Sequence, residues 1–220
     1  MNHVASANSS LTNPPLTHKI TLVIATGNRG KFNEIAVLLQ GVDVLIVPLD
    51  RAGRVEVPPE GGDSFQENAR LKAMAASTAT GHLSLADDSG LEVDFLGGQP
   101  GVLSARFGGA RLTDTERNCL LLRALDGVPV ERRTARFRCA VALANPTGAV
   151  WLSEGVCEGR IATAVRGEHG FGYDPIFEIP SLGRTLAEIG AEIKNRLSHR
   201  AQAIREARGT LGQLLLSMRC

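Results

Sequence analysis

The chain contains 220 residues, with 24 basic and 23 acidic side chains, and 43% of its residues are hydrophobic. This length can bury a substantial core, and we expect one domain rather than two small ones. The near balance of charge excludes a long-range field for nucleic acid or an anionic membrane, so any basic patch must be local. No apolar run approaches the roughly 20 residues of a membrane helix, and the start lacks a signal-like pattern, so we expect a cytoplasmic protein.

Residues 1–18 differ in composition from the rest of the chain. They are polar and rich in Ser, Asn and Pro, which predicts a flexible extension in front of a single domain at residues 19–220. The four cysteines show no CxxC spacing, and three lie among apolar residues, so we expect reduced structural thiols.

The first predicted elements are a strand, a glycine loop and a helix. Residues 19–26 are apolar and β-branched, which predicts a central strand buried on both faces, and helical spacing of apolar residues follows from Phe32. Between them, the backbone N–H groups of GNRGK (27–31), a helix N-terminus and the Lys31 charge suit a phosphate. The glycine spacing is two residues shorter than in a P-loop, so a Walker-type ATPase is disfavoured. A tight turn with a solvated lysine remains the alternative.

The next segment contains a strand, an irregular loop and a helix. Residues 42–48 read as a strand, and the loop at 58–62 (PPEGG) holds too many breakers for regular structure. Ser64 and Glu67 form a capping-box pattern for a helix that we expect to run to Gly81. Asn68 and Lys72 are four positions apart, so both lie on one helix face, either as surface residues or beside a site that includes Glu60.

Two adjacent acids follow an apolar strand in the sequence LADDSG (85–90). Asp-Ser-Gly is typical of turns, so we predict that Asp87 and Asp88 lie at a strand end, with a separate strand at 91–96. Carboxylates side by side raise each other's pKa, a cost that a divalent metal or a basic partner between them removes. A solvated turn is the alternative.

The middle of the chain predicts a turn, a helix and a hairpin. Glycine and proline force a turn at 97–101, and Thr113 with Glu116 forms a second capping box, opening a helix that Gly127 ends. Residues 136–144 and 149–157 alternate as hairpin strands, and residues 160–165 would extend the same sheet.

Two further segments carry candidate binding residues. Loop 167–175 places Phe171 and Tyr173 on either side of a glycine, a composition that suits stacking on a nucleobase, although a hydrophobic plug beneath a turn is the alternative. Near the C-terminus, residues 193–200 (IKNRLSHR) precede a helix for which Ser198 is a natural N-cap. Lys194, His199 and Arg200 at this helix start make a candidate anion site, whereas a lone surface histidine would need no such role.

Six blocks occur in an order that resembles one known family, the inosine triphosphate pyrophosphatases. The blocks are ATGNRGK (25–31), SFQENARLKA (64–73), LADDSGLEVD (85–94), GGQPGVLSARFGG (97–109), GFGYDPIF (170–177) and the stretch 194–200 that ends in SHR. The resemblance spans about residues 20–208. The leader at 1–18 is additional, and Ile193 stands where the family commonly has an acid.

The resemblance implies a fold, an assembly and a reaction. The fold would be α/β, with a long mixed central β-sheet, flanking helices and two lobes around an active-site cleft, as a homodimer. The reaction would be Mg²⁺-dependent hydrolysis of non-standard purine nucleoside triphosphates such as ITP, dITP and XTP. Water would attack the α-phosphorus and release pyrophosphate and the monophosphate, which cleanses the nucleotide pool.

The resemblance also implies a role for each matched residue. Asp88 would act as the base on water and, with Glu60 and Asp87, would hold Mg²⁺. Phosphates would contact Thr26, Gly27, Asn28, Arg29, Gly30, Lys31 and Lys72. Ser89 would contact the substrate, Phe171, Gly172, Tyr173 and Asp174 the base and sugar, and Lys194, His199 and Arg200 the purine edge and phosphates.

Two other functions remain open from the sequence. The first is a pyrophosphatase for modified pyrimidine or 7-methylated nucleotides on a similar fold, which the purine-edge residues near the C-terminus disfavour. The second is a sensor that binds a nucleoside triphosphate without cleaving it. Release of pyrophosphate from ITP in the presence of Mg²⁺ separates an enzyme from a sensor.

Overall fold

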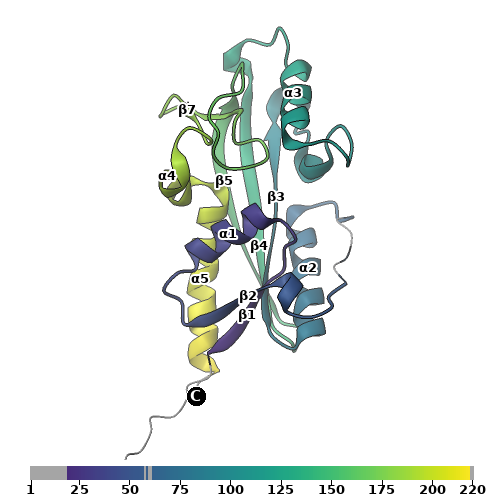
Figure 1. The fold of residues 1–220 in the computed structure, drawn as a ribbon, viewed down its shortest axis with the longest axis vertical. Helices are drawn as coiled ribbons and strands as arrows, with labels where there is room; N and C mark the ends of the chain where they lie inside the picture. Colours follow the sequence, from purple (N-terminus) through teal and green to yellow (C-terminus); the bar gives the residue numbers. More distant parts are fainter. Residues whose placement is uncertain (1–18, 57, 59–60, 219–220) are drawn as a thin grey trace, which may run out of the picture.

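The computed structural model describes residues 19–56, 58 and 61–218 (Figure 1). These residues form an α/β fold in which a seven-stranded mixed sheet, in the order β2-β1-β3-β4-β5-β6-β7, is flanked by helices. The strands are β1 (Ile20–Ile24), β2 (Val44–Pro48), β3 (Leu83–Val93), β4 (Thr134–Ala144), β5 (Val150–Ile161), β6 (Phe177–Ile179) and β7 (Arg184–Thr185). The α-helices are α1 (Arg29–Leu38), α2 (Phe65–Thr80), α3 (Asp114–Ala124), α4 (Gly190–Leu197) and α5 (His199–Ser217). Short 3₁₀ turns are η1 (Leu49–Arg51), η2 (Asp94–Leu96), η3 (Gly101–Arg106) and η4 (Val130–Arg132).

The direction of the strands changes at β3. Strands β2, β1 and β3 run parallel to one another. From β4 to β7, each strand is antiparallel to the strand before it in the sheet. The pairing of β1 with β3 ends where Ile24 meets Leu85, but β3 continues beside β4 to Val93. The second half of β3 therefore has no strand on the β1 side, and this notch at the end of β1 is where ligands bind in many α/β folds.

Helices cover both faces of the sheet near β1. Helices α1 and α5 cover one face, where Ile35 and Ile204 pack against Leu85 in an aliphatic core. Helix α2 covers the other face through alanines such as Ala73, which pack against Ala86 and Ala142. Alanine side chains allow a close approach of helix to sheet.

A separate hydrophobic core occupies the opposite end of the long strands. The ends of β3, β4 and β5 pack there with α3, β6 and the loops that follow β5, around Leu91, Leu121 and Phe177. Figure 1 shows these elements at one end of an elongated molecule, with α1, α2, β1 and β2 toward the other. The predicted α/β sheet with two lobes is confirmed; that residues 19–220 form a single domain stays a prediction.

Several predicted helix ends are confirmed. The side chain of Ser64 accepts a hydrogen bond from the Glu67 N–H at the start of α2, and Gly81 ends this helix with φ of +69°. Thr113 and Glu116 form a reciprocal capping box at α3, and Ser198 caps α5. At α2 the box is not reciprocal, since the Glu67 carboxylate accepts from Arg70 instead.

The prediction of a turn at the two acids is wrong. Residues 83–93 form one continuous strand, so Asp87 and Asp88 lie in its middle rather than at its end. Pairing with β4 along its whole length overrides the turn preference of Asp-Ser-Gly. Gly90 is required here by packing and not by a turn, because a Cβ at this position would lie 2.4 Å from the Gly101 carbonyl oxygen.

Four other boundaries differ from expectation. Strand β1 lies second from the sheet edge rather than at the centre. Helix α1 begins at Arg29, so part of the expected glycine loop is helical, and residues around Lys194 form α4 instead of irregular chain. Strand β5 ends at Ile161 and not near residue 165.

Three cysteines lie within the described residues, and all three are free thiols. Cys119 is exposed, whereas Cys139 and Cys157 are buried. Burial raises the pKa of Cys139 to about 12 and that of Cys157 to about 11, so both stay protonated and unreactive. Cys139 and Cys157 fit the expectation of reduced structural thiols, whereas Cys119 is a free thiol on the surface. Cys220 and the predicted extension at 1–18 lie outside the described residues. In the part of the chain that the structure describes, no helix combines the length and the apolar character needed to cross a membrane.

Gly155 allows α5 to lie directly on β5. A Cβ on Gly155 would lie 2.0 Å from the His199 carbonyl oxygen and 2.8 Å from the Ala203 nitrogen. We predict that Gly155→Ala lowers the free energy of unfolding by about 1–3 kcal/mol, because backbone atoms must move to make room. The matched control is Gly209→Ala, an exposed site in α5 with open space around it, which should stabilise the protein by about 0.5–1 kcal/mol. Urea unfolding of both variants gives the comparison, and equal midpoints would contradict the proposed contact.

Candidate functional site

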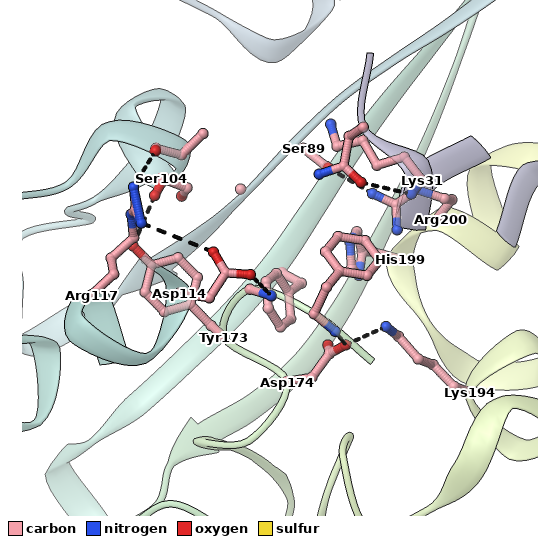
Figure 2. Close-up of a pocket in the computed structure, with 16 residues that line it drawn as sticks. Lys31, Ser89, Ser104, Asp114, Arg117, Tyr173, Asp174, Lys194, His199 and Arg200 are labelled. Atoms are coloured by element: carbon pink, nitrogen blue, oxygen red, sulfur yellow. Dashed lines mark hydrogen bonds and ion pairs between the residues drawn. The ribbon is translucent and has the colours of Figure 1, made fainter. Parts of the chain in front are cut away.

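The notch beside β3 contains a cavity of about 110 Å³ (Figure 2). Its two sides are formed by residues that are far apart in the sequence. Lys31, Ser89, His199 and Arg200 form one side, and Ser104, Asp114, Arg117 and Tyr173 face them from the other. Phe171, Asp174 and Lys194 complete the wall beside α4.

Asp87 sits at the centre of a cluster of cations. Its Oδ2 lies 2.9 Å from Arg200 Nη2 and 3.1 Å from Lys31 Nζ, and it accepts a hydrogen bond from Ser89 Oγ at 3.2 Å. Burial opposes ionisation of Asp87, but the charges of Lys31 and Arg200 outweigh it and hold its pKa well below the usual range. Asp87 is therefore ionised at neutral pH, and its second oxygen, Oδ1, has no partner among the described residues.

Asp88 lies in a different electrostatic setting. Lys72 Nζ donates to Asp88 Oδ1 at 2.8 Å, and Asn68 Nδ2 donates to Oδ2 at 3.0 Å. Burial is the largest influence and raises the pKa of Asp88 despite Lys72 and Asn68, which favour the charged form. A carboxylate with a raised pKa is a stronger base, so this is the acid of the pair that can take a proton.

The two acids do not share one cation, because neighbouring residues in a strand point to opposite faces of the sheet. Asp87 points toward α1 and α5, and Asp88 toward α2. Each has its own basic partner, which corrects the expectation of a single cation between them.

Glu34, on α1, joins the two cationic residues of the C-terminal helices. Its Oε1 lies 2.7 Å from Lys194 Nζ and its Oε2 lies 2.5 Å from Arg200 Nη1. Sequence reasoning missed this residue. Its position three residues after Lys31 places it on the same helix face, and that spacing was the available signal.

The loop at 167–175 contacts Lys194 and Arg200 through its Phe171 ring. Lys194 Nζ lies 4.8 Å and Arg200 Cζ 5.6 Å from the centre of the Phe171 ring, within the range of cation–π interactions. Asp174 Oδ2 accepts from Lys194 at 2.5 Å and from the Phe171 N–H at 2.8 Å. Gly30 leaves room for the ring, because a Cβ there would lie 2.6 Å from Phe171 Cδ1.

His199 is present in the site but does not supply a charge. It is fully buried and stacks on Phe137, with ring centroids 4.7 Å apart, and its Nδ1 has no partner in the described chain. Burial, with Arg200 and Lys194 nearby, lowers the pKa of His199 well below its ordinary value. The imidazole is therefore neutral at pH 7, and its predicted part in an anion site would rest on hydrogen bonding rather than on charge.

The glycine loop borders both this cavity and a larger one. Asn28 caps α1 by accepting from the Lys31 N–H at 3.0 Å, and Thr26 Oγ1 accepts from the Asn28 N–H at 3.2 Å. A second cavity of about 650 Å³ opens beside this loop, and Asn28 lines both. Thr26, Gly27 and Arg29 line only the larger cavity, next to the other basic residues Arg51 and Arg54.

Comparison with known proteins identifies the family. The model of the Ham1 family matches residues 22–209. This chain belongs to the Ham1 family. The resemblance expected from the six sequence blocks is thereby confirmed.

Two curated Ham1 family relatives carry the name dITP/XTP pyrophosphatase. The protein from Desulforamulus reducens is 48% identical over 195 residues, which cover 89% of this chain and 97% of the relative. The protein from Geobacillus kaustophilus is 51% identical over 185 residues, which cover 83% of this chain and 90% of the relative.

Solved structures show the same fold. A HAM1 protein from Coxiella burnetii superposes with a TM-score of 0.80 at 40% identity, covering 88% of this chain and 99% of that one. A nucleoside-triphosphatase, dITP/XTP pyrophosphatase, from Mycobacterium abscessus superposes with a TM-score of 0.65 at 38% identity, covering 90% and 98% of the two chains.

The Ham1 fold brings most of the predicted site residues together. Those that line the first cavity or contact its lining residues are Asn28, Gly30, Lys31, Asp87, Ser89, Phe171, Gly172, Tyr173, Asp174, Lys194, His199 and Arg200. Asp88 and Lys72 pair with each other on the α2 side of β3. Thr26, Gly27 and Arg29 lie at the neighbouring cavity. Glu60 lies outside the described residues. Besides Glu34, sequence reasoning missed Ser104 on η3 and Asp114 and Arg117 on α3. The predicted capping box at Thr113 explained α3 without placing it beside the site.

The described residues fit a metal ion only in part. They contain no cluster of three or more His, Cys, Asp or Glu side chains that could hold a metal by themselves. Mg²⁺ commonly takes one or two protein carboxylates and completes its shell with water and phosphate oxygens. Asp88 offers one such carboxylate, whereas Asp87 Oδ2 is already occupied by Lys31 and Arg200.

The charge of Asp87 should have a pH-dependent effect on stability. Breaking a buried ion pair by removing one partner costs about 3–5 kcal/mol, so we predict a loss of this size for Asp87→Asn at pH 7. Because the pKa of Asp87 is lowered by folding, its stabilisation is complete above the ordinary aspartate pKa of about 4 and is lost as the pH falls toward the folded value. Urea unfolding at a series of pH values should therefore show the difference between parent and variant shrinking below about pH 4.

The control for this measurement is Asp94→Asn. Asp94 pairs with Arg136 at 2.9 Å on the surface, so its loss should cost less than about 1 kcal/mol. A cost for Asp87→Asn as small as that for Asp94→Asn would contradict the assigned role of Asp87.

Proposed function

We propose that this chain hydrolyses dITP, ITP and XTP to the corresponding monophosphate and pyrophosphate. Relatives named dITP/XTP pyrophosphatase, aligned over nearly their whole length, support the substrate class. The site supports the chemistry, because an acid with a raised pKa, Asp88, is held by Lys72 and Asn68, and Lys31 pairs with the neighbouring Asp87 at the start of α1. The observation that carries the proposal is the contrast between the partners of the two acids, since Lys31 and Arg200 hold Asp87 and Lys72 with Asn68 holds Asp88.

The phosphate end of the substrate would lie over the start of α1. Lys31 and Lys72 place positive charge on the two faces of β3, and the N–H groups near Asn28 add the helix dipole. These groups cover the charge that pyrophosphate gains as it leaves, which is the main requirement for phosphoryl transfer.

Asp88 would orient the attacking water and take its proton. The hydrogen bonds from Asn68 and Lys72 fix the carboxylate, so little reorganisation is needed during the reaction. Asp88, with Glu60 as the predicted second ligand, would also hold Mg²⁺, which supplies a Lewis acid at the phosphate oxygens when bound.

The base would occupy the cavity that Phe171, Lys194 and Arg200 line together. Hypoxanthine and xanthine carry a carbonyl at position 6, and adenine carries an amino group. Of the five N–H groups of Arg200, four donate to Asp87 (twice), Ser89 and Glu34 among the described residues. Lys194 uses two of its three, on Asp174 and Glu34, and is the better donor for the 6-carbonyl.

Pyrophosphate release is the direct test of the proposed function. With Mg²⁺ present, the chain should release pyrophosphate from dITP, ITP and XTP much faster than from GTP, ATP or dUTP. Binding of these nucleotides without pyrophosphate release would favour a sensor, and preference for dUTP would favour a pyrimidine enzyme. The homodimer that the family resemblance implies also stays a prediction, which the mass of the protein in solution can test.

Removing the base should stop turnover without unfolding the protein. We predict that Asp88→Asn lowers kcat for dITP by about 10²–10⁴-fold, the usual contribution of a general base. Asp126→Asn, on the exposed turn after α3, serves as control and should keep the parent's kcat. An Asp88→Asn variant that melts like the parent and keeps more than a tenth of its activity would rule out the assigned role.

Two lysines should differ in what they recognise. Lys72→Ala should lower kcat/KM for ITP and ATP by similar factors, about 10–100-fold, because phosphates do not depend on the base. Lys194→Ala should lower kcat/KM mainly for ITP, bringing the ITP-to-ATP ratio closer to one. Measured ratios that stay at the parent's value in Lys194→Ala would move the selectivity to another residue.

A further inference from the structure

Helix α3 contacts the loop that is proposed to hold the base. Asp114 Oδ2 accepts from the Gly172 N–H at 2.7 Å, and Asn118 Nδ2 donates to the Gly172 carbonyl oxygen at 3.0 Å. Both backbone groups of one loop residue are therefore occupied by a single helix. Figure 2 shows Asp114 on the side of the cavity that faces Lys31 and Arg200. The loop itself lines the cavity with Phe171, Tyr173 and Asp174.

A chain of contacts connects α3 to the strand that carries the two acids. Arg117 Nη2 donates to the Ala105 carbonyl oxygen at 2.6 Å and Nη1 to the Leu112 carbonyl oxygen at 3.0 Å, which joins α3 to η3. Ser104 Oγ, on η3, accepts from the Leu91 N–H of β3 at 2.8 Å. The Ser104 carbonyl oxygen in turn accepts from Tyr173 Oη at 2.9 Å.

Stability alone does not account for Asn118. It is 3% exposed, and its Oδ1 has no partner within the described residues. Only the NH2 group of its side-chain amide makes a hydrogen bond there. An unpaired buried oxygen costs about 1–3 kcal/mol, and an apolar side chain in α3 would avoid that cost. The amide remains useful for what its Nδ2 holds, which is the Gly172 carbonyl group.

We propose that Asp114 and Asn118 are positioning residues, and that residues 101–124 act as a strut that holds loop 171–174 at a fixed place relative to β3. This inference rests on the proposed function. It adds how the loop that recognises the base is held at a fixed position relative to Asp88, the acid that takes part in the reaction. Without the strut, loop 171–174 would have to order when substrate binds, and the ordering would weaken binding of the base.

The test compares variants at the two contacts with a matched control at the same helix end. Asp114→Ala and Asn118→Ala each remove one hydrogen bond to Gly172. Glu116→Ala removes the capping box of α3, in which Glu116 Oε2 accepts from the Thr113 N–H at 2.8 Å, without touching the loop. Asp114→Asn keeps an oxygen that can accept from Gly172 and should restore most of the parent's behaviour.

Kinetics and binding should separate positioning from general damage. We expect KM for dITP to rise about threefold in Asp114→Ala and about tenfold in Asn118→Ala, the range for one lost hydrogen bond, with kcat changed less than twofold. Calorimetry should show the same weakening for inosine 5′-monophosphate and no change for inorganic pyrophosphate. Equal losses for both ligands, unchanged KM in both variants, or the same KM rise in Glu116→Ala would overturn the proposal.

A structural readout keeps this inference separate from the proposed function. Amide hydrogen exchange of Gly172, followed by NMR, should become faster in Asp114→Ala and stay at the parent's rate in Glu116→Ala. A parent that released no pyrophosphate from dITP would contradict the proposed function, while the exchange comparison would still decide whether Asp114 holds the loop. Unchanged exchange at Gly172 in Asp114→Ala would overturn the strut.

Discussion

Arg200 is the buried cation around which the site is assembled. A guanidinium with 2% exposure cannot remain in the interior unless acceptors surround it, and three different elements supply or carry the groups involved. Asp87 and Ser89 come from β3, Glu34 comes from α1, and Arg200 itself lies in the first turn of α5. The need to satisfy one charge thus fixes how the N-terminal helix, the central strand and the C-terminal helix meet.

The period of a β-strand divides the two adjacent acids between two tasks. Because they point to opposite faces, Asp87 is surrounded by Lys31 and Arg200, whereas Asp88 meets one lysine and one neutral amide. The first carboxylate is held ionised and stabilises the fold. The second has a raised pKa and a fixed orientation, which are the properties of a general base. If both carboxylates pointed to the same face of the sheet, the same cations would have to serve both tasks.

Aromatic rings also contact the cationic residues of the site. Neutral His199 stacks on Phe137 beneath the cations, and the Phe171 ring covers Lys194 and Arg200 from above. A base in the cavity beside these groups would meet an aromatic face and fixed donors, an arrangement that distinguishes a carbonyl from an amino group more strongly than it distinguishes sizes. Such discrimination matches the substrates in the names of the dITP/XTP pyrophosphatases to which this Ham1 chain is similar.

The sequence by itself determined the features that depend on neighbours in the chain. Helix caps at Ser64, Thr113 and Ser198 follow from local hydrogen bonding, and the order of the motif blocks along the chain is enough to indicate the family. Only the tertiary structure decided the course of residues 83–93, because pairing with β4 and two separate basic partners outweighed the turn preference of Asp-Ser-Gly. It alone revealed Glu34 and Asp114 at the site and the neutral state of His199, since each depends on groups that are distant in sequence. Local sequence patterns predict the backbone structure, whereas the burial and charge of a site residue depend on how the whole protein packs.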